Sequence, residues 1–157
     1  MRAYRFDHLD GLDGLRQREE ADPKPQRGEV LVRVRAVSLN FRDLAMPRGR
    51  YPRPCLPGLI PISDAAGEVI EVGKGVEDFK VGDRVAYAAM PGSYSEERLI
   101  DAKYLVKLPK YISYEMGAAM MLKGLTAQYL LRRTFKVKAG DTAVSYTHLT
   151  LPTKRIV

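Results

Sequence analysis

Hydrophobic and polar residues alternate most regularly along residues 29–37. Val30, Val32 and Val34 fall on one face of this segment, and the neighbouring arginines fall on the other. Successive side chains of an extended chain point to opposite faces, so this period of two is typical of a half-buried β-strand. We therefore predict a strand here, after a turn at 22–28 that contains two prolines and a glycine.

Several shorter segments are also strand candidates, because their residues alternate in hydrophobicity and turn residues separate them. They cover residues 2–6, 15–19, 64–72, 84–89, 93–100 and 104–108. Short strands at a spacing of roughly 8–12 residues favour an all-β barrel or sandwich over repeated βαβ units. Glycines 67, 73, 75 and 82 are expected to serve close packing or positive φ angles.

The pattern changes to that of a helix at residue 113. Ser113 suits the N-cap, Glu115 suits the positive end of a helix dipole, and the next residues are rich in alanine and methionine. A second helical stretch with an apolar stripe is predicted at 123–133. Residues 137–144 are predicted to form a turn that leads into a strand.

The length and composition limit the class of protein. A chain of 157 residues has room for one domain of ordinary size, and 45% hydrophobic with 29% charged residues is typical of a soluble globular protein. No apolar run approaches the roughly 20 residues needed to cross a bilayer, and the first residues lack the apolar part of a signal peptide. We therefore expect a cytoplasmic protein with no membrane partner.

Charge and cysteine content argue against two further classes. The net charge is +7, but the lysines and arginines are spread along the chain and interrupted by acids, so we expect no nucleic-acid partner. Cys55 is the only cysteine. A single cysteine excludes an intramolecular disulfide and a cysteine-rich zinc site.

Six short motifs occur in the order that is typical of one known superfamily. They are Leu39-Asn40-Phe41-Arg42-Asp43, Gly49-Arg50-Tyr51-Pro52, Asp64-Ala65-Ala66-Gly67-Glu68-Val69, Val72-Gly73-Lys74-Gly75-Val76, Phe79-Lys80-Val81-Gly82-Asp83-Arg84-Val85 and Met121-Leu122-Lys123-Gly124-Leu125-Thr126-Ala127. With these motifs, residues 1–143 resemble the medium-chain dehydrogenase/reductase superfamily. The resemblance implies a mainly β chain with some α: a GroES-like, partly open β-barrel at 1–112, then one or two helices at 113–143 that lead to a Rossmann domain absent from this sequence.

Within that superfamily, the chain resembles the zinc-free branch. A catalytic zinc needs about three protein ligands, and the zinc enzymes supply a cysteine early in the barrel and a histidine before the glycine-containing strand. Here those places hold residues 40–43 and Ser63-Asp64, and the only histidines are His8 and His148. We therefore expect no metal.

Two later segments, Gly92-Ser93-Tyr94-Ser95-Glu96-Glu97 and residues 121–133, resemble NADPH:quinone oxidoreductases in particular. This resemblance implies an enzyme that transfers a hydride from NADPH or NADH to a small molecule, a quinone or an activated carbonyl or enone, without zinc. The second tyrosine that many such enzymes carry near the position of Ala45 is missing, and residues 37–62 are equally similar to zinc-free alcohol dehydrogenases. A zinc-independent alcohol dehydrogenase-like enzyme or enoyl reductase is one alternative, and a non-catalytic GroES-like binding module is another.

The resemblance also implies the site residues. Asn40 and Tyr51 are the catalytic candidates: Asn40 would position the nicotinamide or the substrate carbonyl, and Tyr51 would line the cleft. Asn40, Thr126 and Lys123 are the cofactor-binding candidates, with Thr126 near the nicotinamide and Lys123 at a phosphate. Each has a structural alternative, namely a turn asparagine, a loop tyrosine, a threonine bonded to a helix carbonyl, and a lysine on a solvated face.

The end of the chain departs from the superfamily. A nucleotide-binding domain would continue with a buried strand and a glycine-rich turn that approaches the pyrophosphate, but residues 144–157 contain no glycine. We expect 144–157 to be a non-native tail. The chain alone is then expected to hold NADPH poorly and to be inactive, and the full-length protein is expected to be a homodimer. The substrate and the choice between NADH and NADPH are left open.

Overall fold

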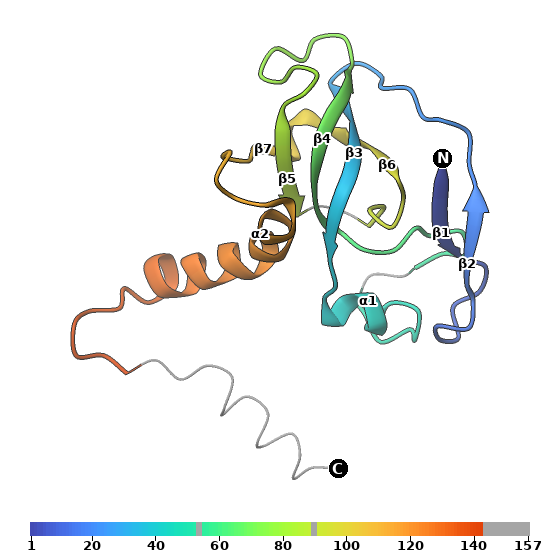
Figure 1. The fold of residues 1–157 in the computed structure, drawn as a ribbon. Coiled ribbons are helices and arrows are strands. Elements are labelled where there is room, and N and C mark those ends of the chain that lie inside the picture. Colours follow the sequence, from blue (N-terminus) through green and yellow to red (C-terminus); the bar gives the residue numbers. More distant parts are fainter. Residues whose placement is uncertain (53–54, 89–90, 143–157) are drawn as a thin grey trace. The chain divides into compact units, whose positions relative to one another are not determined.

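The alternating segment at 29–37 forms the longest strand of the structure, β3 (Glu29–Ser38). Figure 1 shows the computed structural model, which describes residues 1–52, 55–88 and 91–142. The chain divides into two compact units, residues 1–125 and 126–157. All the strands in the described part of the chain belong to the first unit.

Strands dominate the first unit. Along the described part of the chain, the elements are β1 (Arg2–Phe6), β2 (Leu15–Glu19), β3, α1 (Phe41–Ala45), β4 (Asp64–Val72), β5 (Arg84–Ala88), β6 (Glu97–Asp101), the short 3-10 helix η1 (Ala102–Tyr104), β7 (Val106–Lys107), α2 (Tyr114–Gln128) and the π-helix η2 (Tyr129–Thr134). The π-helix η2 and the last three residues of α2 belong to the second unit. The order β6-β3-β4-β5-β7 makes one antiparallel five-stranded sheet, and β1 and β2 make a second, two-stranded sheet. The prediction of a mainly β fold with helices is confirmed.

The observed strand bounds differ from the predicted ones mainly between residues 93 and 108. Residues 93–96 do not belong to β6, because they run beside β1 instead: the N–H of Tyr4 donates to the carbonyl oxygen of Tyr94 at 2.9 Å. The segment predicted as a strand at 104–108 shortens to β7, because η1 occupies the residues before it.

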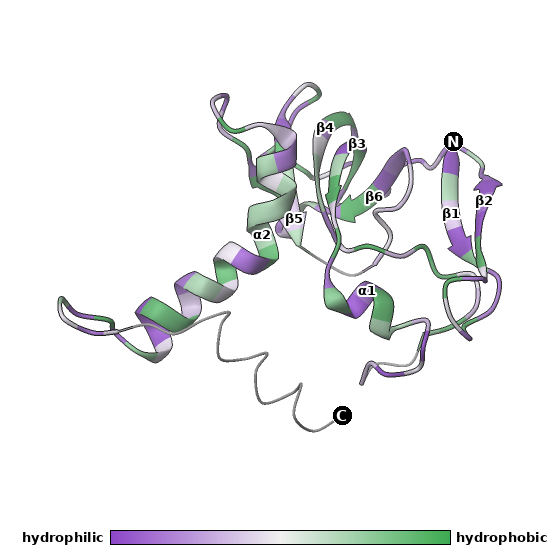
Figure 2. Ribbon diagram, turned by 60° about the horizontal axis from the view of Figure 1, so that its bottom comes forward, coloured by the Kyte–Doolittle hydropathy of each residue, from purple (hydrophilic) through white to green (hydrophobic). Residues whose placement is uncertain are grey.

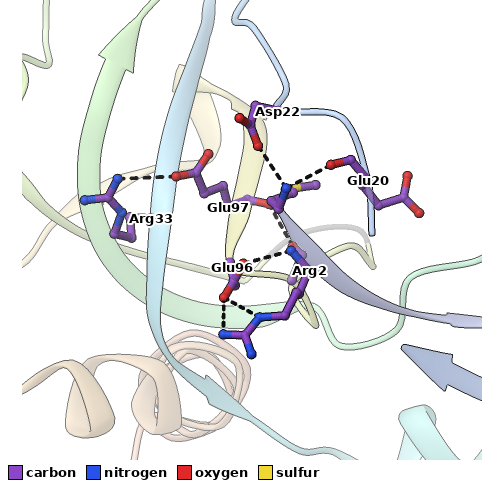
Figure 3. Close-up of polar contacts among 8 residues, drawn as sticks. Arg2, Glu20, Asp22, Arg33, Glu96 and Glu97 are labelled. Carbon is purple, nitrogen blue, oxygen red and sulfur yellow. Dashed lines mark hydrogen bonds and ion pairs between the residues drawn. The ribbon is translucent and has the colours of Figure 1, made fainter. Parts of the chain in front are cut away.

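Polar contacts tie the two-stranded sheet to the five-stranded one (Figure 3). The backbone N–H and the Nε of Arg2 donate to the two carboxylate oxygens of Glu96, both at 2.8 Å. The next residue, Glu97, pairs with Arg33 of β3 at 3.3 Å. The sheets are thereby joined along one side, and the described residues form no closed barrel.

The main core lies against one face of the five-stranded sheet. Its buried residues come from β3, β4, β5, β6 and the residue that follows η1: Val30, Val32, Ala65, Val69, Val85, Tyr87, Ile100 and Leu105. Figure 2 shows the hydrophobic residues along β3 and β4, whereas β2 is mainly hydrophilic. The alternation seen in the sequence of β3 is therefore structural: Val30 and Val32 point into this core, whereas Arg33 and Arg35 are exposed.

A second core cluster covers part of the other face. Ala66 of β4 and Ala86 of β5 pack with Leu108 and with Ala118 of α2. Small residues on both strands let the helix approach the sheet closely, and Ala118 is fully buried. The start of α2 is thus fixed by packing, and Ser113 caps it as predicted, with Oγ accepting from the N–H of Met116 at 3.2 Å.

Two of the glycines singled out from the sequence show why glycine is required. A Cβ on Gly67 would lie 2.1 Å from the carbonyl oxygen of Arg33 on the neighbouring strand, so no larger residue fits there. Gly82 has a φ of 88° in the turn before β5, a conformation that side chains disfavour. The prediction of close packing at one position and positive φ at the other is confirmed.

The helical region is one continuous stretch from Tyr114 to Thr134 rather than two, because α2 runs directly into η2. The turn predicted next is present, with the N–H of Lys138 donating to Asp141 Oδ2 at 2.7 Å. The strand predicted after it extends into residues 143 and 144, which lie outside the described residues. Among the described helices, none combines the length and apolar character needed to cross a membrane. The predicted tail at 144–157 lies outside the described residues, and the predicted domain boundary at 112/113 stays a prediction.

Candidate functional site

Asn40 lies where β3 passes into α1, and local hydrogen bonds fix it there. Its backbone is extended, with φ −129° and ψ 160°, which ends the strand and starts the helix. The backbone N–H of Asn40 donates to Asp43 Oδ2 at 2.8 Å. This is one half of a capping box, an arrangement that satisfies otherwise unpaired groups at a helix start.

The Asn40 side chain is held by Asp64, the first residue of β4. Asn40 Nδ2 donates to Asp64 Oδ2 at 3.1 Å and to the carbonyl oxygen of Ser38 at 3.3 Å. The other carboxylate oxygen of Asp64 accepts from Arg42 Nη2 at 2.9 Å. Asp64 is fully buried, so its charge needs these partners.

A second carboxylate, Asp43, is buried beside this group. Burial raises the pKa of Asp43, and the charge of Asp64 adds to the rise, while the Asn40 N–H and Arg42 lower it. Asp43 Oδ1 has no hydrogen-bond partner, and neither have Arg42 Nε and the hydroxyl of Ser63. In the described part of the first unit, these three unpaired buried polar atoms all lie at the junction of β3, α1 and β4.

The backbone before β4 is also unusual. Ile62 has a φ of 64°, and it is the only residue other than glycine with a positive φ in the described ranges. A β-branched residue is strongly disfavoured there, so the surroundings must hold it. Its carbonyl oxygen accepts from the N–H groups of Gly92 and Ser93 at 3.0 and 2.8 Å. This kink directs the chain into Asp64.

A cavity of about 360 Å³ opens beside Asn40. Its lining is mainly apolar: Phe6, Leu12, Leu15, Leu39, Asn40, Phe41, Asp43, Leu44, Pro61, Ile62 and Tyr94. Mainly apolar pockets of roughly 300–1,000 Å³ with a few polar groups are typical small-molecule sites. The only amide and the only carboxylate in this lining are those of Asn40 and Asp43.

The structure brings Lys123 to the same junction. Lys123 Nζ donates to Ser38 Oγ at 2.9 Å and to the carbonyl oxygen of Leu39 at 3.4 Å. Lys123 is therefore not merely a lysine on a solvated helix face, because it ties α2 to the last residues of β3. The amine lies next to the segment that carries Asn40.

The other two candidates lie elsewhere. Tyr51 is half-buried in a bend after α1 and is not part of the lining of the cavity beside Asn40. Thr126 is exposed and belongs to the second unit. Their roles stay predictions.

Asp64 and Arg42 are the members of the site that sequence reasoning did not select. Both stand in the motifs used for the resemblance, and the zinc comparison drew attention to the position of Asp64. The sequence did contain a signal for Asp64: it is a charged residue at the start of a strand that is rich in small apolar residues. A charged residue in such a strand is buried and needs a partner of opposite charge or a hydrogen-bond donor.

Residues 26–131 match the alcohol dehydrogenase GroES-like domain family. The chain belongs to this family. The matched residues include the whole five-stranded sheet, and the predicted GroES-like fold class is confirmed.

Two named relatives are similar to this chain over most of its length. A quinone oxidoreductase of Pseudomonas aeruginosa is 51% identical over 133 residues, which is 84% of this chain and 41% of that relative. A 2-haloacrylate reductase of a Burkholderia species is 44% identical over 137 residues, 83% of this chain and 41% of that relative.

A solved structure is similar to this chain in both fold and sequence. The Escherichia coli quinone oxidoreductase complexed with NADPH superposes with a TM-score of 0.82 and 40% identity, over 88% of this chain and 42% of that one. The resemblance to quinone oxidoreductases of the medium-chain dehydrogenase/reductase superfamily is thus confirmed. The chain spans about two fifths of the length of these relatives.

Proposed function

We propose that the protein carrying this GroES-like domain is an oxidoreductase that transfers a hydride from NADPH to a quinone or to an activated carbonyl or enone. The observation that carries the proposal is the 51% identity to a quinone oxidoreductase, with Asn40 fixed beside a mainly apolar cavity. The similarity to a 2-haloacrylate reductase favours an electron-poor double bond as a second class of substrate.

The residues present fit a nicotinamide cofactor. Asn40 offers a polar group next to a mainly apolar cavity of about 360 Å³, which suits a flat ring that carries one carboxamide. NADPH, when bound, supplies the hydride. The chain would contribute orientation and exclusion of water: Asn40 contacts the nicotinamide or the substrate carbonyl, and Lys123 holds the β3 end in place.

We also propose that no metal takes part. The chain has a single cysteine and two histidines, His8 and His148. In the described part of the chain, no three side chains of histidine, cysteine, aspartate or glutamate come together in a way that suits a metal ion. Zinc analysis of the purified protein tests this, since stoichiometric zinc bound at Asp43 or Asp64 contradicts it.

The first experiment measures NADPH consumption with quinones, enones and alcohols as separate substrates. It compares this chain with a chimera in which the chain is joined to the remaining segment of the Pseudomonas aeruginosa quinone oxidoreductase. We expect the chimera to reduce quinones or enones and the chain alone to be inactive, because the adenosine and pyrophosphate sites would lie in the added segment. A chimera that folds but oxidises only alcohols supports the alcohol dehydrogenase alternative.

The binding-module alternative makes a different prediction. A non-catalytic GroES-like module would assemble into a ring and would not require Asn40. If the protein is an enzyme, Asn40→Ala in the chimera should lower kcat/KM. If it is a binding module, the variant should form the same ring assembly as the unaltered chimera.

The remaining proposals concern the whole protein. They are a boundary at 112/113, the start of a nucleotide-binding domain at 113–143, a non-native tail at 144–157 and a homodimer of the full-length protein. The absence of nucleic-acid and membrane partners and the cytoplasmic location stay predictions.

A further inference from the structure

The hydrogen bonds of Asn40 decide which way its amide faces. Both neighbours of the Asn40 amide nitrogen, a carboxylate oxygen of Asp64 and the carbonyl oxygen of Ser38, are acceptors. Neither carries a hydrogen, so the NH2 end of the amide must face them. The amide oxygen faces the N–H of Asp43, but no hydrogen bond of normal geometry forms between them.

Asp64 is held firmly enough to impose this orientation. It pairs with Ser38 of β3 on one side and with Ala88 of β5 on the other, and it is fully buried. Arg42 occupies its second oxygen at 2.9 Å. Turning the Asn40 amide over would bring two oxygens together and leave a buried carboxylate with one partner fewer, which is costly.

We propose that Asp64 is a positioning residue that leaves Asn40 only its amide oxygen for a ligand, so that Asn40 accepts a hydrogen bond from the carboxamide N–H of the nicotinamide and does not donate to the substrate carbonyl. The proposal rests on the proposed function. It selects between the two roles that were left open for Asn40.

The choice follows from the chemistry of the two ligands. The carbonyl oxygen of a quinone or an enone has lone pairs and no hydrogen, so it would repel the Asn40 oxygen. The nicotinamide carboxamide has an NH2 group that can donate to it. Any hydrogen bond that stabilises the negative charge on the substrate oxygen must therefore come from another donor.

The orientation can be tested on this chain without any ligand. Asn40 is the only asparagine in the sequence, so labelling asparagine with ¹⁵N and ¹³C gives one side-chain amide signal. We expect its two hydrogens to exchange with solvent about tenfold or more slowly than those of a solvent-exposed glutamine. Asp64→Ala should remove most of this protection.

Matched variants separate positioning from general loss of structure. Glu68→Gln changes a carboxylate on the same strand that contacts Arg35 at the surface, so it should leave the Asn40 protection unchanged. Arg42→Ala removes the other partner of Asp64 and should leave most of the Asn40 protection in place. If Asp64→Ala does not fold, Asp64→Asn keeps the volume and one acceptor, and intermediate protection is expected. Exchange at the glutamine rate in the unaltered chain overturns the role of Asp64.

The ligand is tested in the chimera, because the chain alone is expected to hold NADPH poorly. The ¹³C signal of the Asn40 amide carbonyl is identified there as the asparagine signal that Asn40→Asp removes. The probes are NADPH and its 3-acetylpyridine analogue, in which a methyl ketone without N–H replaces the carboxamide. We expect NADPH to move the carbonyl signal downfield and the analogue to bind about tenfold more weakly or to leave the signal in place, since one hydrogen bond is lost. Equal shifts and affinities overturn the inference. Slow exchange together with no turnover by the chimera overturns the proposed function but not the orientation of Asn40.

Discussion

The guanidinium carbon of Arg84 lies 4.4 Å from the centre of the Tyr114 ring, so the first residue of β5 lies against the first residue of α2. The same guanidinium donates to the carbonyl oxygens of Pro109, Lys110 and Ile112 at 3.1, 3.0 and 2.7 Å. A single side chain thus fixes the loop that leads into α2.

Arg84→Lys is therefore expected to lower the free energy of unfolding by about 2 kcal/mol, because an ammonium cannot reach three carbonyls and the ring together. Urea denaturation followed by circular dichroism measures it. Arg35→Lys is the control: Arg35 makes a 3.5 Å contact with Glu68 at the surface, and such a change should cost at most about 0.5 kcal/mol. Equal losses in both variants would argue against this role of Arg84.

Two glycines of α2 are expected to respond in opposite ways to alanine. A Cβ on Gly117 would lie 2.9 Å from Leu108 Cδ1 and 3.3 Å from the Cβ of Ala66, whereas a Cβ on Gly124 meets nothing nearer than 3.8 Å. Gly117→Ala should lower the free energy of unfolding by about 1–3 kcal/mol through overpacking. Gly124→Ala should raise it by about 0.5–1 kcal/mol through helix propensity. Thermal melts of both variants give the comparison, and a gain from Gly117→Ala would contradict the close packing of helix and sheet.

Asp43→Asn should make the protein more stable at neutral pH. Burial raises the pKa of Asp43 above its ordinary value of 3.8, so the folded state binds the proton more strongly than the unfolded state does. The ionised carboxylate therefore destabilises the fold increasingly as the pH rises from the unfolded pKa through the folded one. The gain from asparagine, which can still accept from the Asn40 N–H, should be present at neutral pH and vanish below the unfolded pKa.

Denaturation curves of this variant across the acid range test the sign. Asp78→Asn, at an exposed position, serves as the control and should change stability little at any pH. A loss of stability at neutral pH would show that the Asp43 charge stabilises the fold.

Cys55 is expected to react slowly with iodoacetamide. Burial raises the pKa of the Cys55 thiol, so less of the reactive thiolate is present at neutral pH. Because Cys55 is the only cysteine, the alkylation rate of the chain reports on it alone. The rate should be lower than that of a small free thiol and should rise when the chain is unfolded in urea. A faster rate in the folded chain would indicate an activated thiol.

Most of the strands could be located from the sequence, and the reason is local. From Val32 to Ser38 the side chains of β3 alternate between more and less buried positions, so its hydrophobic pattern indicates where the strand lies. The first four residues of β4 are all buried, and the small apolar residues among them mark that strand instead. The bounds of β6 could not be predicted, because residues 93–96 pair with β1, which is distant in sequence. The bounds of β7 could not be predicted either, because η1 takes the residues before it. Alternation shows which face a residue takes but not which strand lies beside it.

The sequence by itself determined the family, the mainly β fold and the placing of Asn40 at the end of a strand, since motif order and local periodicity depend on neighbouring residues. The tertiary structure alone decided that Asp64 holds the Asn40 amide and that Lys123 reaches Ser38, 85 positions away. These contacts depend on the register between β3 and β4 and on the packing of α2 on the sheet. Register and packing arise from interactions between distant segments, which no local pattern records.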